Sequence, residues 1–263
     1  MCRWIAYAGP PIYLESLVLT PEYSLIRQSL SAREGNTTNG DGFGIGWYGE
    51  LPEPGLFKDT LPAWNDENLK SVSQHIRAAM LFAHVRASTG TATSRGNCHP
   101  FAWRQWMFMH NGKIGGFDRV RRDLMLAVAP ALFGEIRGTT DSELFFYLMA
   151  THGLTEDPAR AFALAAGVVL ECMARARVSE PFRMTAALTN GELILALRYA
   201  SDGNPPTLYH GRSEDGAGTL VLSEPIDDSA GRWHPVPPGH LLRVANGAVE
   251  VEPFQPATAP DGV

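Results

Sequence analysis

Apolar residues follow two spacings up to about residue 180, and only one of these spacings continues afterwards. In the first part, short apolar runs of strand length alternate with stretches whose apolar residues recur at helical spacing. After Pro181, short apolar runs are separated by turn signals such as Asn190-Gly191 and Asn246-Gly247. The pattern predicts a mixed chain of helices and strands that ends in strands.

The patterns predict elements at definite ranges. The predicted strands are residues 3–8, the end of the stretch 39–48, and residues 80–85, 106–109, 184–188, 193–199, 219–222, 240–244 and 249–251. The predicted helices are residues 23–30, 67–79, 117–129, a helix beginning near residue 140, and residues 158–175. Residues 51–66 are predicted as a surface loop and residues 255–263 as a loose tail. No repeat or linker divides the sequence, so a single domain of residues 1–263 is expected.

Composition narrows the class of protein. Apolar residues make up 44% and charged residues 19% of the chain, which is typical of a globular protein with a full core. The net charge of −6 is not the strongly positive charge expected of a protein that binds nucleic acid. The most apolar helical stretch, residues 161–173, is too short to cross a membrane. Three cysteines without regular spacing argue against a disulfide framework and fit a reducing, cytoplasmic location.

The first two residues, Met1-Cys2, carry the first candidate chemistry. Removal of Met1 would leave a thiol and a free α-amine on one residue. An α-amine titrates near pH 7.7–8.0 and can act as a base, and a thiol needs such a base to become a nucleophile. Taken alone, a chance cysteine at this position is the better interpretation. A predicted strand at residues 3–8, which Gly9-Pro10-Pro11 is expected to stop, would fix the position of Cys2.

The stretch 39–48 places four glycines at alternate positions before a strand. Such glycines permit positive φ or the close approach of a ligand to the backbone, but they also suit a tight turn with small-residue packing. These two interpretations carry similar weight. A phosphate loop is excluded, because no lysine followed by Ser or Thr stands at the required spacing.

Two strand ends carry polar groups suited to recognising charge. Arg86 follows the predicted strand 80–85, and Ser88 and Thr89 come after it, an arrangement that suits bidentate binding of a carboxylate. Asn111-Gly112 follows the strand 106–109, where a side-chain amide and an unhindered backbone N–H could stabilise an oxyanion. The plainer alternatives are a surface arginine and an Asn-Gly hairpin turn.

A helix start supplies the next candidate, and three histidines remain. Asp141 stands at a helix start where either Thr140 or Asp141 could be the cap, or Asp141 could bind a substrate ammonium group. Cys98-His99 and the set His84, His99 and His110 match no zinc spacing, so each histidine is expected to be structural and hydrogen-bonded. No metal site is predicted.

Taken in order, these motifs resemble the class II glutamine amidotransferase domain, an N-terminal-nucleophile hydrolase. The resemblance is detailed over residues 2–150 and rests on Met1-Cys2-Arg3, the glycines around Asp41-Gly42, Arg86 to Thr89, His110-Asn111-Gly112 and Thr140 to Glu143. It implies an α+β fold, a four-layer αββα sandwich of two stacked antiparallel sheets. The opening residues and the stretch 39–48 are closer to small stand-alone members, among them hydrolases of a γ-glutamyl amide in ergothioneine biosynthesis.

The resemblance also implies a role for each candidate. Cys2 would be the nucleophile, Asn111 and Gly112 the oxyanion hole, Arg86 with Thr89 the site for the α-carboxylate of glutamine, and Asp141 the site for its α-ammonium group. Many members carry tryptophan and then histidine where this chain has Ala87 and Gly90, so the pocket wall is expected to differ.

The expected function is hydrolysis of the γ-glutamyl amide of glutamine or a related γ-glutamyl compound, through a Cys2 thioester. No metal or organic cofactor is required by this chemistry, since the nucleophile, its base and the oxyanion donors are all supplied by the chain. The alternative is a non-catalytic subunit that senses glutamine or donates ammonia within a larger complex. The sequence leaves open whether the chain forms a homo-oligomer or acts with a separate synthase partner.

Overall fold

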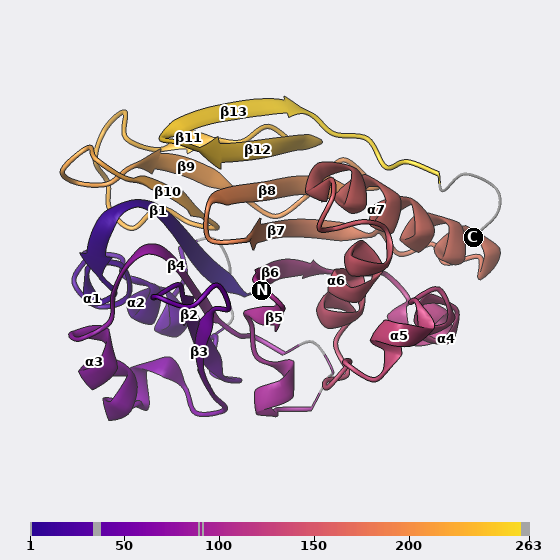
Figure 1. The fold of residues 1–263 in the computed structure, drawn as a ribbon, viewed down its shortest axis with the longest axis horizontal. Helices are drawn as coiled ribbons and strands as arrows, with labels where there is room; N and C mark the ends of the chain where they lie inside the picture. Colours follow the sequence, from indigo (N-terminus) through magenta and orange to yellow (C-terminus); the bar gives the residue numbers. More distant parts are fainter. Residues whose placement is uncertain (1, 34–37, 89, 91, 259–263) are drawn as a thin grey trace.

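The structure, a computed structural model, describes the chain except for residues 1, 34–37, 89, 91 and 259–263. Two antiparallel sheets lie face to face, and helices pack against the outer face of each (Figure 1). α1 to α3 gather beside one sheet and α4 to α7 beside the other. The predicted four-layer α+β sandwich is confirmed. No helix of the described residues is long and apolar enough to cross a membrane.

The first sheet is seven-stranded, in the order β11-β9-β10-β1-β4-β2-β3. Its strands are β1 (Arg3–Tyr13), β2 (Phe43–Trp47), β3 (Gly55–Asp59), β4 (Arg77–Val85), β9 (Tyr209–Arg212), β10 (Thr219–Leu222) and β11 (His234–Pro235). β1 and β4 are its central pair, with Arg3 opposite Val85. The start of β1 therefore lies beside the end of β4, which brings Cys2 and Arg86 together.

The second sheet is six-stranded, in the order β13-β12-β8-β7-β6-β5. Its strands are β5 (Phe101–Trp103), β6 (Trp106–Lys113), β7 (Arg183–Thr189), β8 (Leu193–Ala200), β12 (His240–Ala245) and β13 (Ala248–Pro253). The helices are α1 (Glu15–Val18), α2 (Leu25–Leu30), α3 (Glu67–Ser73), α4 (Phe117–Leu126), α5 (Pro130–Phe133), α6 (Asp141–Thr151) and α7 (Pro158–Arg175). Short 3-10 turns lie at Ala63–Asn65 and Arg95–Asn97.

Strict alternation along β1 links the layers. Trp4 and Ala6 point into the core between the sheets, where they join Met107 and Met109 of β6. Ile5 and Tyr7 point to the opposite face of the sheet, where they pack against the helices. Because side chains alternate across a strand, Arg3 to Tyr7 of β1 are buried on both faces of the sheet. This burial fixes the strand that Cys2 precedes.

Several predicted boundaries are confirmed and others are wrong. α7 spans the predicted residues 158–175, and β10 the predicted residues 219–222. β1 does not stop at residue 8 but runs to Tyr13, with a register shift between Ala8 and Ile12 that accommodates the prolines. The predicted helix 67–79 ends at Ser73, and the predicted loop 51–66 contains β3.

The described part of the tail is docked and not loose. The backbone N–H of Ala257 donates a 2.9 Å hydrogen bond to the carbonyl of Ala163 in α7. A Cβ at Gly167 would lie 1.9 Å from the Ala257 oxygen, so the chain crosses the helix at close approach. Residues 255–258 therefore cover α7.

Candidate active site

The structure brings most of the predicted site residues to one cavity. The cavity has a volume of 360 Å³, and its lining includes Cys2, Arg86, Asn111, Gly112 and Asp141. These residues come from the start of β1, the end of β4, the end of β6 and the start of α6. Thr89, predicted beside Arg86, lies outside the described residues.

Cys2 immediately precedes β1 and is half-buried. Its thiol donates a weak hydrogen bond of 3.6 Å to the carbonyl of Ala87. Burial raises the pKa of the Cys2 thiol, and the positive charge of Arg86 opposes that shift. The thiol is therefore protonated at neutral pH and needs a base to become a nucleophile.

Arg86 is only 3% exposed and is tied to the segment before β2. Its backbone N–H donates to the carbonyl of Gly42 at 2.9 Å, and its Nη1 donates to the carbonyl of Asp41 at 3.1 Å. The Asp41 carboxylate in turn accepts from the backbone N–H of Ser88 at 2.7 Å. This arrangement fixes both the guanidinium and the loop that follows it, so the interpretation of Arg86 as a surface residue is wrong.

The glycines of the stretch 39–48 are required for packing. A Cβ at Gly44 would lie 2.1 Å from the carbonyl oxygen of His99, and one at Gly46 would lie 2.4 Å from the sulfur of Met107. Gly42 has φ +107° and would place a Cβ 2.6 Å from the sulfur of Cys98. Small-residue packing accounts for Gly44 and Gly46, and Gly42 also adopts the positive φ that the other interpretation expects.

Asn111 and Gly112 lie within β6 and do not form a hairpin turn. They pair in register with Thr185 and Met184 of β7, and the Thr185 hydroxyl donates to the carbonyl of Asn111 at 3.2 Å. A Cβ at Gly112 would lie 2.0 Å from the carbonyl oxygen of Arg183. Glycine is therefore needed where β6 passes β7 beside the cavity.

Asp141 is the first residue of α6, and Thr140 is its N-cap. The Thr140 hydroxyl accepts from the backbone N–H of Glu143 at 3.1 Å, which decides between the two predicted caps. The Asp141 carboxylate accepts from the N–H of Ile114 at 2.8 Å and from the N–H of Ser142 at 2.8 Å. These bonds tie α6 to the end of β6. A carboxylate has about four lone-pair sites, so acceptor capacity is left for a ligand in the cavity.

Three histidines surround the base of this site, and the expectation that all are hydrogen-bonded is wrong. His110 shares a 2.7 Å hydrogen bond with the Ser142 hydroxyl, and His84 a 3.3 Å contact with the carbonyl of His110. His99 stacks on His84 at 4.2 Å between centroids, but neither of its ring nitrogens has a partner within the described chain. Burial lowers the pKa of all three, that of His84 to about 3, so all are neutral.

Some lining residues were not singled out from the sequence as part of the site. The sequence predicts no site role for His99, His110 or Ser142, although His110 and Ser142 lie within its motifs, yet all three line the cavity. Their positions next to strand and helix ends were the available signal. Within the described residues no group of His, Cys, Asp and Glu side chains is placed to hold a metal ion.

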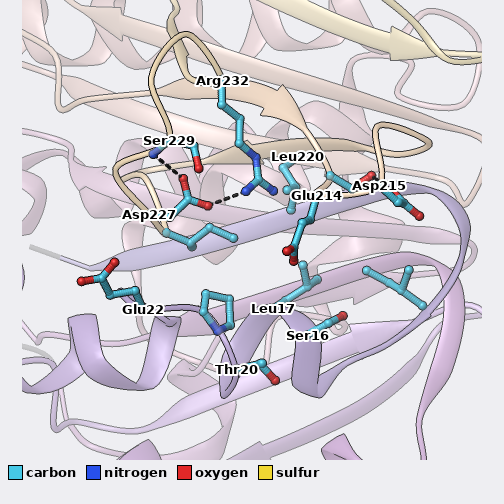
Figure 2. A pocket seen from close by; sticks show the side chains of 14 residues that line it. Ser16, Leu17, Thr20, Glu22, Glu214, Asp215, Leu220, Asp227, Ser229 and Arg232 are labelled. Atoms are coloured by element: carbon cyan, nitrogen blue, oxygen red, sulfur yellow. Dashed lines mark hydrogen bonds and ion pairs between the residues drawn. The ribbon is translucent and has the colours of Figure 1, made fainter.

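A larger hollow lies elsewhere, between α1 and the loops around Ser213 and Arg232 (Figure 2). This groove has a volume of 680 Å³ and exposes the carboxylates of Glu22, Glu214 and Asp215. Arg232 forms an ion pair with Asp227 on its wall. The groove thus offers carboxylates, but no cysteine lines it, whereas Cys2 lines the smaller cavity.

More than half of the chain matches a known family of enzymes. The family model of class-II glutamine amidotransferases matches residues 18–202, a range that contains Arg86, Asn111, Gly112 and Asp141. The chain belongs to the class-II glutamine amidotransferase family.

Similar proteins cover nearly the whole chain. The probable glutamine amidotransferase DUG3 of Saccharomyces cerevisiae is 31% identical over 97% of this chain and 84% of its own length. The gamma-glutamyl-hercynylcysteine sulfoxide hydrolase of Mycolicibacterium smegmatis is 30% identical over 97% of this chain and its full length, 100%. A solved glutamine aminotransferase class-II domain protein from Silicibacter pomeroyi has a TM-score of 0.79 and 35% identity over 97% of this chain and 100% of its own.

Proposed function

We propose that this enzyme hydrolyses the γ-glutamyl amide bond of glutamine or a related γ-glutamyl compound through a thioester on Cys2. The observation that carries the proposal is the meeting of a thiol, a guanidinium, a carboxylate and an Asn-Gly pair in one 360 Å³ cavity. A free amino-acid head group has one positive and one negative charge, which match Asp141 and Arg86. The hydrolase relatives act on a gamma-glutamyl compound by name, which supports the same substrate class.

The proposed nucleophile is Cys2 after removal of Met1. Burial raises the pKa of this thiol, so the α-amine of the same residue is the base that takes its proton during attack. The sulfur then bonds to the amide carbon, the C–N bond breaks, and the transferred proton leaves with the amine. Water attacks the thioester, releases glutamate and restores the thiol.

Asn111 and Gly112 are proposed to hold the oxygen on which negative charge develops. The two donors would be the Asn111 side-chain amide and the Gly112 backbone N–H. Both lie in a strand that pairs with β7, so their positions are set before the substrate arrives. Preorganised donors of this kind stabilise the transition state more than the bound substrate.

Arg86 and Asp141 are proposed to bind the α-carboxylate and α-ammonium groups of the substrate, with Thr89 assisting Arg86. Ala87 lies in the cavity wall, and its methyl group leaves more room than the larger side chain common in the family. The pocket is therefore proposed to admit a γ-glutamyl compound larger than glutamine.

We further propose that the chain acts as a single-domain, cytoplasmic hydrolase that transfers nothing to an acceptor. Its strands after Pro181 complete the two sheets and do not build a synthase domain. All three cysteines are free thiols, as a reducing compartment requires. If a synthase partner is needed, turnover will occur only when a second protein is added.

The test compares protein with Met1 removed and protein that retains it, with glutamine and a panel of γ-glutamyl amides as substrates. Mass spectrometry follows glutamate and the released amine. We expect equal release of both products by the processed protein alone, and none by the protein that retains Met1. A Cys172→Ala variant, altered in the distant helix α7, is the matched control and should keep full activity. Binding of glutamine without turnover by the processed protein would favour the sensing function instead.

A further inference from the structure

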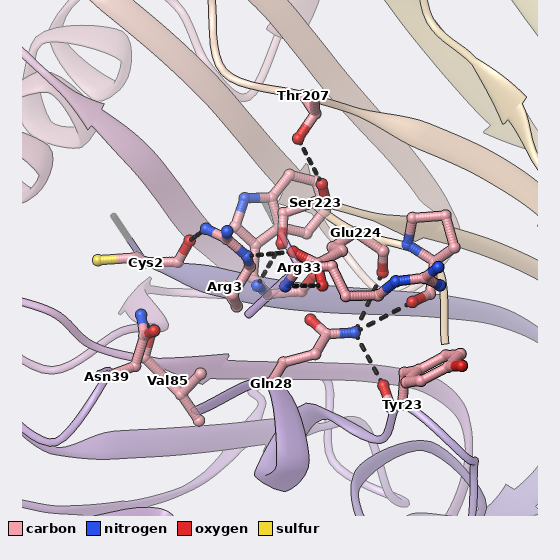
Figure 3. A network of polar contacts seen from close by, with 12 residues as sticks. Cys2, Arg3, Tyr23, Gln28, Arg33, Asn39, Val85, Thr207, Ser223 and Glu224 are labelled. Carbon is pink, nitrogen blue, oxygen red and sulfur yellow. Dashed lines mark hydrogen bonds and ion pairs between the residues drawn. The ribbon is translucent and has the colours of Figure 1, made fainter. Parts of the chain in front are cut away.

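A buried ion pair lies directly behind the nucleophile. Arg3 Nε donates to Glu224 Oε2 at 2.9 Å, and the two side chains are 3% and 2% exposed (Figure 3). The residues are 221 positions apart in the sequence. Replacing a buried pair of charges by apolar groups is often neutral or stabilising, so stability alone does not explain this pair.

The same guanidinium also holds Cys2. Arg3 Nη1 donates to the backbone carbonyl of Cys2 at 2.9 Å. Figure 3 shows this carbonyl turned toward Arg3 and the Cys2 sulfur pointing away from it. A guanidinium is planar and rigid, so its contact with Glu224 fixes the direction in which it can hold the carbonyl of Cys2.

Glu224 is itself held in place. Its second carboxylate oxygen, Oε1, accepts from the backbone N–H of Arg33 at 2.8 Å, and its backbone carbonyl accepts from Gln28 Nε2 at 3.3 Å. The preceding residue, Ser223, pairs with Trp4: its N–H donates to the Trp4 carbonyl at 3.0 Å, and its hydroxyl accepts from the Trp4 N–H at 2.9 Å. The anchor for the first residues of the chain is therefore built on the segment that follows β10.

We propose that Arg3 and Glu224 are positioning residues that fix the backbone of Cys2 and so aim its thiol into the cavity. Chain termini fray unless they are tied down, and the network supplies such a tie at the one residue that must be held still. The proposal rests on the function proposed above, because it assumes that Cys2 is the nucleophile.

The first arm of the test measures turnover of Arg3→Lys and Glu224→Gln, both with Met1 removed. A lysine keeps the positive charge and can pair with Glu224, but its single ammonium lacks the planar fork that reaches both partners. Glutamine keeps the size of Glu224 and removes its charge. We expect kcat to fall by about 10²-fold, the effect of a misplacement of about 1 Å, with KM little changed because Arg86 and Asp141 are intact. The matched control is Asp227→Asn, which lies three residues after Glu224 in the chain, breaks the Arg232–Asp227 pair on the groove wall and should leave kcat unchanged.

The second arm does not need turnover. Iodoacetamide labelling, read by mass spectrometry of peptides, compares Cys2 with Cys98 and Cys172 in the same sample. We expect Cys2 to be labelled several-fold faster in both variants, because a released N-terminus exposes its half-buried thiol, while the buried Cys98 and Cys172 keep their wild-type rates. Slower turnover together with faster labelling of Cys2 alone would show that the thiol is misplaced in a protein that still folds.

Two results would overturn the proposal. If kcat and Cys2 labelling both stay at wild-type values, the network does not position the nucleophile. If all three cysteines become more reactive together, the Arg3–Glu224 pair stabilises the whole fold and does not position the Cys2 thiol in particular. Should the wild-type protein cleave no γ-glutamyl amide, the proposed function fails, and the labelling arm still decides whether Arg3 and Glu224 hold Cys2.

Discussion

The cavity around Cys2 and the groove around Arg232 differ in what holds their polar groups. The groove is the larger, at 680 Å³ against 360 Å³. Its carboxylates, among them Glu214 and Asp215, are carried by an exposed loop. The cavity draws its polar groups from strand ends and a helix start whose backbones are buried and paired. Volume alone therefore does not identify the candidate site, whereas the arrangement of its polar groups does.

The ion pairs of the two regions repeat this difference. Arg3 and Glu224 are 3% and 2% exposed, whereas Arg232 and Asp227 are 16% and 21% exposed. Solvent reaches the second pair more than the first and weakens the attraction between its charges. A change in the groove should therefore stay local, and the same change near the cavity should reach the thiol.

The largest expected effect follows from removing the nucleophile. Cys2→Ser should abolish γ-glutamyl hydrolysis, on the order of the 10⁶-fold loss seen when a nucleophile is removed elsewhere, while the protein still folds. Asp227→Asn in the groove should keep wild-type turnover. Glutamate release, with circular dichroism to confirm folding, measures both variants. Turnover by a pure Cys2→Ser protein at the wild-type rate would place the chemistry elsewhere.

Asn111→Ala should lower kcat by about 10²–10³-fold with little change in KM, as expected for one oxyanion donor. The reason is that the amide is used mainly when charge develops on the substrate oxygen. Asn204→Ala, at an exposed turn, is the control with unchanged kinetics. A rise in KM alone would show that Asn111 contacts the substrate without stabilising the oxyanion.

Arg86→Lys and Asp141→Asn should act mainly on binding. Arg86→Lys keeps the charge but loses the two-donor guanidinium contact, and Asp141→Asn loses the charge of its contact. With each contact worth about 1.5–3 kcal/mol, KM should rise by about 10- to 10²-fold. Glutamine and its analogue without the α-ammonium group should separate the two residues. Asp141→Asn is expected to reduce the preference for the amine-bearing substrate, and Arg86→Lys is not. Equal loss for both substrates in both variants would contradict the assignment.

The smallest effect is on stability at acidic pH. The pKa of His84 is lowered by burial to about 3 in the folded protein, against an ordinary 6.5. Between these values the unfolded state binds more protons, so stability is fully present above pH 6.5 and is lost as pH falls toward 3. At pH 5 the loss is about 2 kcal/mol for this residue.

Urea unfolding at pH 7 and pH 5 measures this loss, which His84→Phe should reduce. Asp227→Asn should leave it unchanged. Burial raises the pKa of Asp227, but hydrogen bonds from Ser229 and Trp233 outweigh burial and keep this pKa below its ordinary value. Asp227 therefore does not titrate between pH 5 and pH 7. An identical pH dependence in wild type and His84→Phe would contradict the burial of a neutral His84.

Much of the fold could be predicted because its signals are local. Apolar periodicity after Pro158 predicts α7 at its observed bounds, and apolar runs predict the cores of β4, β6, β7 and β8. The sequence predicts a loop in place of β3, because this edge strand pairs only with β2 and its side chains are partly exposed. Pro10 and Pro11 suggested a stop, but a register shift lets β1 continue through them.

The candidate site could be predicted as a set of residues but not as an arrangement. Cys2, Arg86 and Asp141 each stand at an element boundary and Asn111 near the end of β6, positions that sequence patterns can locate. Their meeting depends on the pairing of β1 with β4 and of β6 with β7, which no local pattern encodes. The bond between Arg3 and Glu224 could not be predicted from a local pattern either, because the two residues are 221 positions apart in the sequence.

The central claim is that Cys2 carries the γ-glutamyl group during turnover. Intact-mass and peptide mass spectrometry of processed protein, quenched in acid during turnover of a γ-glutamyl amide, tests it most directly. We expect a mass increase of one γ-glutamyl group on the peptide that begins with Cys2, absent from Cys2→Ser protein and removed by hydroxylamine. Steady release of glutamate with the adduct on Cys98, or on no cysteine at all, would contradict the claim.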